Sequence, residues 1–137
     1  KLYDELKYSD GSITTIDYDN DSKMLVYGDS FGAIVSYEVN RKRKRDVKKI
    51  NSSIRKIHIN SSRNFVSVYQ NKKIDIWYFD KRTDSYKRAV EKQKFNLSKI
   101  NGLEFHPNQE KIYIDDDSGN LLIFNYELDE LGLLQAK

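Results

Sequence analysis

The chain of 137 residues contains no cysteine, one proline and one methionine, Met24. Without cysteine it has neither a disulfide framework nor a cysteine-based zinc site. The absence fits a reducing compartment, so we expect an intracellular protein, cytoplasmic or nuclear. There is no apolar stretch of about 18 residues and no signal-like segment, so we expect no membrane span. The chain begins with Lys1, and we expect it to be a piece of a longer protein.

Arrangements typical of catalysis are also missing from the sequence. It has two histidines and no nucleophile, base and orienting group at a readable spacing, which acid–base and covalent catalysis require. It has no glycine-rich phosphate-binding loop. We therefore expect no enzymatic activity, no catalytic residue and no cofactor.

Two acidic clusters resemble parts of metal sites. Asp17, Asp19 and Asp21 resemble the opening of a calcium loop, but Ser22 and Gly28 stand where an EF-hand requires Gly and Glu. Alternation along a strand explains their spacing. The second cluster, residues 115–117, lacks further ligands at a defined spacing and is interpreted as a solvated hairpin tip. We expect no metal site in either.

What the sequence does contain is a pattern that occurs three times. Each copy has an apolar triad, a short β-rich run, a turn and a closing apolar run. The triads are Ile13, Ile16 and Tyr18, then Ile54, Ile57 and Ile59, then Ile100, Leu103 and Phe105, at offsets of 41 and 46 residues. Nine residues beyond the middle member of each triad stand Leu25, Val66 and Ile112, and the copies close on Tyr37, Trp77 and Phe124.

A period of 40 to 45 residues built from short strands is typical of WD-repeat propeller blades. The sequence resembles a divergent WD-repeat protein over residues 12–126. The family's Gly-His pair is replaced by Gly11-Ser12, Ser52-Ser53 and Ser98-Lys99, and its closing Trp-Asp by Tyr37-Glu38, Trp77-Tyr78 and Phe124-Asn125. The hydrophobic spacing therefore survives, whereas we expect the family's polar hydrogen-bond network to be largely lost. The alternative is a β-sandwich of evenly spaced hairpins.

The resemblance implies an all-β fold of three four-stranded antiparallel blades, over residues 12–50, 51–96 and 97–137. Residues 1–11 are either the outer strand of a preceding blade or a tail. The other outer strands are predicted at residues 46–50, 86–90 and 127–137. Trp77 is expected to pack between blades, and His58 to be a strand residue rather than a ligand. Because a propeller needs four to eight blades, we expect an incomplete arc that missing sequence or a partner chain completes.

Residues 41–49 form the strongest charge feature of the chain. The run holds seven basic residues and one acidic residue, a net charge of +6, whereas the whole chain carries +3. Such a run can bind phosphate or an acidic partner, or serve as a nuclear-import signal. It can also be a solvated hairpin whose charges prevent edge-to-edge pairing. The candidate binding residues are Arg41, Lys42, Arg43, Lys44, Arg45, Lys48 and Lys49.

Two functions are consistent with these features. The WD-repeat resemblance implies a non-catalytic scaffold for protein–protein interaction within a larger assembly, with protein partners that include whatever completes the propeller. The alternative is a propeller that docks on phosphate through residues 41–49, in nucleic acid or on an anionic membrane surface. Fold alone does not decide between them.

Overall fold

The computed structural model describes residues 5–70, 74–92, 100–106, 109–125 and 130–135, and the regular structure in these ranges is β-strand throughout. The strands form three four-stranded antiparallel meanders. The first sheet contains β1 (Ile13–Asp19), β2 (Met24–Asp29), β3 (Ala33–Glu38) and β4 (Arg43–Lys49). The middle sheet contains β5 (Ile54–Ile59), β6 (Phe65–Tyr69), β7 (Ile74–Asp80) and β8 (Ser85–Lys92). The last sheet contains β9 (Ile100–Phe105), β10 (Lys111–Asp116), β11 (Asn120–Asn125) and β12 (Glu130–Gln135).

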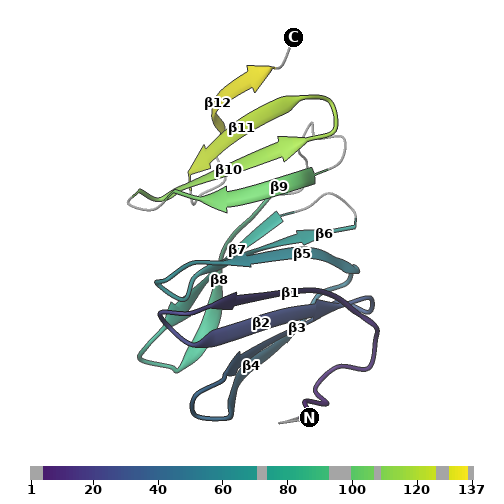
Figure 1. Cartoon of the computed structure of the whole chain (residues 1–137), viewed down its shortest axis with the longest axis vertical. Helices are drawn as coiled ribbons and strands as arrows, with labels where there is room; N and C mark the ends of the chain where they lie inside the picture. Colours follow the sequence, from purple (N-terminus) through teal and green to yellow (C-terminus); the bar gives the residue numbers. More distant parts are fainter. Residues whose placement is uncertain (1–4, 71–73, 93–99, 107–108, 126–129, 136–137) are drawn as a thin grey trace.

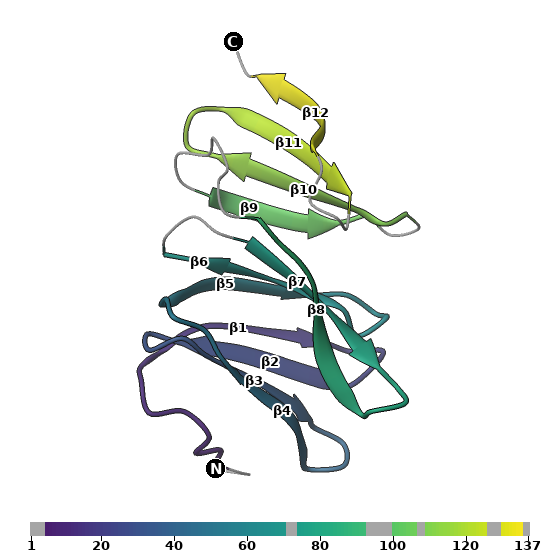
Figure 2. The ribbon, with the colours of Figure 1, turned by 180° about the vertical axis from the view of Figure 1, so that it is seen from behind.

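The three sheets follow one another in a single row (Figure 1). The view from behind shows the same order, with the first and last sheets at opposite ends (Figure 2). The row does not close on itself. The prediction of three antiparallel meanders in an open arc is confirmed, and the two layers of a sandwich are not formed.

A β-bulge explains the spacing within each apolar triad, whose second member lies three residues after the first and whose third lies two residues after the second. In the β5–β6 ladder Ile54 pairs with Tyr69 and Lys56 with Val68, so Arg55 is an extra residue. Thr14 and Asn101 occupy the same place in β1 and β9. An extra residue returns the first member of the triad to the face of the other two. Each triad therefore lies on one face of its sheet.

The register of the middle sheet differs from the prediction by one residue. Phe65 lies opposite Ile59, as Leu25 lies opposite Tyr18 in the first sheet. Phe65, not Val66, is thus the equivalent of Leu25. Five residues lie between Ile59 and Phe65, but six lie between Tyr18 and Leu25. The β5–β6 connection is therefore one residue shorter, and a shift of one residue moves a side chain to the other face of a strand.

Two hydrophobic cores join the three sheets. The core between the first and middle sheets contains Met24, Val26, Ile34, Ile54, Ile57, Ile59, Phe65, Tyr69, Trp77 and Tyr86. The core between the middle and last sheets contains Val66, Val68, Ile74, Ile76, Leu103, Phe105, Ile112, Ile114, Leu122 and Phe124. The triad of β5, and Leu103 and Phe105 of β9, pack against the preceding sheet.

The outer strands follow the prediction in two sheets and depart from it elsewhere. β8 contains the predicted residues 86–90, and β12 lies within residues 127–137. β4 begins at Arg43, three residues before the prediction, so seven of the nine residues of the basic run are strand. Residues 5–12 form no strand. An outer strand there needs a neighbouring strand to pair with, and the described residues offer none.

The turns that follow β2 and β10 are held by an aspartate. The Asp29 carboxylate accepts hydrogen bonds from the backbone N–H groups of Phe31 and Ala33. Asp116 accepts equivalent bonds in the last sheet and is 5% exposed. The prediction that residues 115–117 form a solvated hairpin tip is therefore wrong for Asp116, because its carboxylate is buried and caps the turn.

Candidate functional site

The apolar triad of the first sheet is exposed, unlike its equivalent in the middle sheet. Ile13, Ile16 and Tyr18 are 52%, 61% and 43% exposed. The corresponding residues of β5, which pack against the first sheet, are 0%, 3% and 5% exposed. Val47 on β4 is also exposed. We call the surface formed by Ile13, Ile16, Tyr18 and Val47 the open face.

One row of paired residues crosses the sheet on the open face. Ile16 pairs with Tyr27, Tyr27 with Val35, and Val35 with Val47, and directly paired residues share a face. The ends of the row are exposed and its centre is buried. The buried Tyr27 hydroxyl has no hydrogen-bond partner among the described residues. Burial raises the pKa of Tyr27, and the nearby Tyr8 and Asp29 raise it further.

The junction of the first and middle sheets shows what the open face lacks. There β1 side chains bond to the backbone of β5, the inner edge strand of the next sheet. Thr15 Oγ1 accepts a hydrogen bond from the Ile57 N–H at 3.1 Å, and Asp17 Oδ2 accepts one from the Ile59 N–H at 2.8 Å. The Thr14 hydroxyl donates to the Ile54 carbonyl. These backbone groups of the middle sheet's edge strand are thus hydrogen-bonded to side chains of the sheet before it.

The structure divides the basic run between two rims of the arc. Arg41 and Lys42 lie in the β3–β4 turn, and Lys49 ends β4. Lys49 lies six residues beyond Arg43 along β4, about 20 Å away at ~3.3 Å per residue. The Lys49 ammonium lies over the ring of Phe31, in the β2–β3 turn. The run therefore does not form a single cluster.

Several cations of the run already have partners. Arg41 Nε lies 3.1 Å from Oε1 of the buried Glu38, and Arg43 Nη2 lies 3.1 Å from Asp84 Oδ2 in the β7–β8 turn. The Lys44 ammonium lies over the ring of Tyr8. Lys48 is half-buried near the far end of β4, and the side chain of Arg45 lies outside the described residues. The Arg43–Asp84 pair joins the β3–β4 and β7–β8 turns, which project from the same side of the arc (Figure 1).

His58 lies between carboxylates of the two neighbouring sheets. Its Nδ1 is 3.3 Å from Asp17 Oδ2, and its Nε2 is 3.5 Å from Glu104 Oε2. Its ring stacks on Phe105 at 5.6 Å between centroids. The prediction of a strand residue between blades agrees with this position. No group of three metal-ligating side chains occurs in the described ranges.

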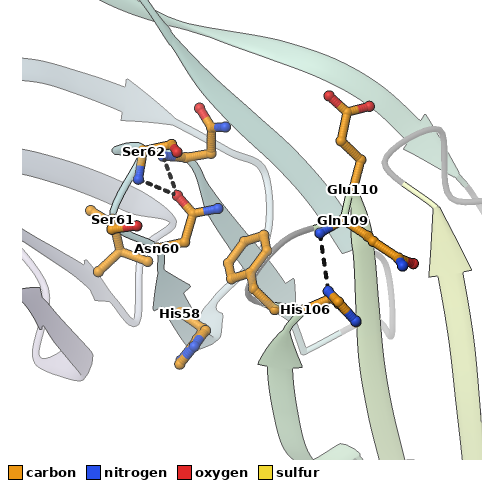
Figure 3. A pocket seen from close by; sticks show the side chains of 10 residues that line it. His58, Asn60, Ser61, Ser62, His106, Gln109 and Glu110 are labelled. Carbon is orange, nitrogen blue, oxygen red and sulfur yellow. Dashed lines mark hydrogen bonds between the residues drawn. The ribbon is translucent and has the colours of Figure 1, made fainter.

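A polar cleft of about 420 Å³ lies between the middle and last sheets beside His58 (Figure 3). It is lined by residues of the β5–β6 turn and of the β9–β10 connection, among them Asn60, Ser61, Ser62, His106, Gln109 and Glu110. Asn60 Oδ1 accepts bonds from the N–H groups of Ser62 and Asn64, and His106 Nδ1 accepts one from the Gln109 N–H. These bonds hold the two turns in shape, which accounts for the polar lining.

A polar network that sequence reasoning missed lies in the middle sheet. Trp77 Nε1 donates to Ser67 Oγ at 2.9 Å, Ser67 donates to the Tyr69 hydroxyl, and Tyr69 donates to Asp75 Oδ2 at 2.5 Å. Arg88 Nε lies 3.2 Å from the same carboxylate oxygen. Polar residues two apart within two apolar runs are the signal that indicates this network. Trp77 packs between sheets as predicted, and it also donates a hydrogen bond.

No protein-family model and no curated protein matches the sequence. The structure is similar to the β-propeller domain of Myceliophteria thermophila Cps50 (Swd1), with a TM-score of 0.74 and 15% identity over 91% of this chain and 44% of that one. It is similar to the WD40 repeats of RRP9, with a TM-score of 0.75 and 18% identity over 96% and 41%. It is also similar to the computationally designed protein Ika4, with a TM-score of 0.70 and 15% identity over 97% and 76%.

These likenesses show that the three sheets have the fold of WD40 β-propeller blades. The chain spans less than half the length of the Cps50 and RRP9 chains. Among the described residues there is no helix long and apolar enough to cross a membrane.

Proposed function

We propose that this chain is a non-catalytic scaffold module for protein–protein interaction, and that the open face is where the segment or chain that completes the propeller docks. The observation that carries the proposal is the contrast between two equivalent triads. The β5 triad is buried against a neighbouring sheet, whereas Ile13, Ile16 and Tyr18 are exposed. Burying one such side chain contributes about 1.5–3 kcal/mol, and contiguous apolar patches mark interaction sites.

The isolated chain provides a test of the proposal. An uncovered apolar face predicts self-association that increases with protein concentration in sedimentation velocity. Replacing Ile16 and Tyr18 by Lys should abolish the association. Tyr78→Lys is the matched control, because Tyr78 is an exposed aromatic residue of β7 in the middle sheet, outside the open face. A compact, stable monomer of the unmodified chain would contradict the proposal.

A second candidate, docking on phosphate, is supported by the Arg43–Asp84 pair. That pair brings Arg41 and Lys42 to the same rim as Lys81 and Arg82 of the β7–β8 turn. Asp80, whose carboxylate lies 2.9 Å from the Lys87 ammonium, offsets part of this charge. The remaining basic rim presents cations from two neighbouring sheets, which a phosphate backbone or headgroup layer would contact together.

A salt titration separates this candidate from the scaffold. Binding of single-stranded RNA or of vesicles containing phosphatidylserine should weaken steeply between 50 mM and 200 mM salt. Replacing Lys42, Lys81 and Arg82 by Glu should remove it without disturbing the Arg43–Asp84 pair. Unchanged binding to both ligands after these substitutions would exclude the candidate. Replacing Lys48 and Lys49 at the opposite rim is the control for net charge.

A further inference from the structure

Two backbone N–H groups of β5 donate hydrogen bonds to acceptors of different chemistry. Thr15 supplies a hydroxyl to the Ile57 N–H, and Asp17 supplies a carboxylate to the Ile59 N–H. The two acceptors stand two residues apart on the inner strand of the preceding sheet. They therefore lie on the same side of that strand and match alternate N–H groups of the next one. Sheet packing at this junction is thus accompanied by a defined polar pairing.

The first sheet has equivalent backbone N–H groups that need the same kind of acceptors. Ile16 and Tyr18 occupy in β1 the positions that Ile57 and Ile59 occupy in β5, as the shared bulge and the ladder registers show. β1 is likewise the edge strand of its sheet. The Tyr18 N–H is bonded at 3.0 Å to Oδ1 of its own neighbour Asp17, in an exposed position. No sheet precedes β1 in the described part of the chain to supply the acceptors.

The junction of the middle and last sheets uses a different pairing. At the positions of Thr15 and Asp17 the middle sheet carries Lys56 and His58. Lys56 Nζ donates to the Asn101 carbonyl at 3.2 Å, and His58 contacts the Glu104 carboxylate. The pairing across a junction therefore varies along the arc, and it distinguishes one neighbouring sheet from another.

The last sheet is a poor match for the open face. At the positions of Thr15 and Asp17 it carries Gly102, which has no side chain to accept a bond, and Glu104. A second copy of this chain that docked its last sheet on the open face would leave the Ile16 position without a hydroxyl. The first sheet itself carries the matching pair, Thr15 and Asp17.

We propose that the open face binds a further antiparallel sheet whose inner strand carries a hydroxyl side chain followed, two residues on, by a carboxylate. The hydroxyl accepts a hydrogen bond from the Ile16 N–H, and the carboxylate accepts one from the Tyr18 N–H. The apolar face of that sheet covers Ile13, Ile16 and Tyr18. This inference rests on the proposed scaffold function and specifies its partner.

The test uses the full chain with a second copy of residues 13–53, its 41-residue repeat, inserted directly before Ile13. The inserted copy forms the added sheet, and the original first sheet is the resident sheet. The added sheet then offers its Thr15 and Asp17 to the resident β1 through the natural β4–β5 connection. Amide hydrogen exchange at the resident Ile16 and Tyr18 is the readout. We expect their protection to increase to that of Ile57 and Ile59 in the same molecule.

Substitutions confined to the added sheet then test the pairing. Thr15→Val and Asp17→Ala should lower the protection of the resident Ile16 and Tyr18 amides by roughly tenfold each, the factor that corresponds to about 1.4 kcal/mol. Asp21→Ala in the added sheet removes the same charge from an exposed turn position and should leave protection unchanged. The same two substitutions in the resident sheet should lower the protection of the Ile57 and Ile59 amides. The size of that decrease is the reference for the decrease at Ile16 and Tyr18.

The outcomes separate the inference from the function on which it rests. If the added sheet protects Ile16 and Tyr18 but Thr15→Val and Asp17→Ala change nothing, the hydroxyl–carboxylate pairing is wrong and the scaffold proposal stands. Failure of the added sheet to protect them would contradict both. Self-association of the unmodified chain that protects the Ile16 and Tyr18 amides as fully as the added sheet does would show that a sheet without the hydroxyl–carboxylate pair is sufficient, which also overturns the inference.

Discussion

Gly28 on β2 and Ile54 on β5 touch at the junction of the first and middle sheets: a Cβ atom at Gly28 would lie 2.5 Å from Cγ2 of Ile54. Both residues are buried, and Ile54 belongs to the core between these sheets. The sheets approach each other this closely because Gly28 has no side chain. A methyl group there must push the two sheets apart.

Gly28→Ala is therefore expected to destabilise the chain by about 1–3 kcal/mol, the usual cost of overpacking. Urea unfolding followed by tryptophan fluorescence measures it, since Trp77 lies in the same core. Ile54→Ala should cost less in the Gly28→Ala background than in the parent chain, because it removes Cγ1 and Cγ2, two of the three Ile54 atoms that the new methyl group would meet. Additive effects of the two substitutions would show that they do not meet.

Ser67→Ala tests the buried polar network of the middle sheet. The Ser67 hydroxyl accepts from Trp77 Nε1 and donates to Tyr69, so its loss leaves a buried indole N–H without this acceptor. We expect a loss of about 1–3 kcal/mol in the free energy of unfolding. Ser62→Ala, at an exposed turn position, should change stability by less than about 0.5 kcal/mol. A loss at Ser67 no larger than that of the control would contradict the role of the network.

Much of the fold could be predicted from the spacing of apolar residues. The triads identify the inner strands because their side chains have to be buried on one face, and the three copies reinforce one another. The register of the middle sheet could not be predicted, since it depends on the β5–β6 connection being one residue shorter than the β1–β2 connection. Val66 and Phe65 are both apolar, so composition did not distinguish them.

The candidate site was less predictable for a physical reason. Residues 41–49 are contiguous in sequence, but an extended strand carries Lys49 away from Arg41 to the opposite rim. Conversely, Lys81 reaches the rim of Arg41 only through the packing of two sheets. The open face could not be identified from the triad of β1 alone, because its apolar residues look the same as those that are buried in β5.

Lys42→Gly should stabilise the chain. Lys42 is a non-glycine residue with φ of +50° in the β3–β4 turn, a conformation that costs L-residues about 1–2 kcal/mol. Glycine adopts it freely but loses more entropy on folding, so the net gain is expected to be about 0.5–1 kcal/mol in thermal or urea unfolding. Lys42→Ala keeps the Cβ atom and should give no gain. Equal effects of the two substitutions would rule out relief of backbone strain.

Acid should weaken the turn that Asp29 holds. Burial acts to raise the pKa of Asp29, but hydrogen bonds from Ser9, Ala33, Gly11 and Phe31 outweigh it and lower the pKa below its ordinary value of 3.8. A lowered pKa stabilises the folded state above the ordinary value, and this contribution is lost as pH falls through the folded pKa. The stability difference between the parent chain and Asp29→Asn should thus shrink on going from pH 7 to below 3.8. A difference that stays constant over this range in urea unfolding would contradict the role of the charged carboxylate.

The most direct test of an uncovered first sheet uses the absence of cysteine from the chain. Ile16→Cys and Ile57→Cys place a single thiol at equivalent positions of β1 and β5, and a thiol reagent at micromolar protein concentration measures their accessibility. We predict that Ile16→Cys reacts at nearly the rate of the unfolded chain in urea. Ile57→Cys should react only as fast as the first and middle sheets separate. Equal, slow labelling of both thiols would show that the open face is already covered and would contradict the account.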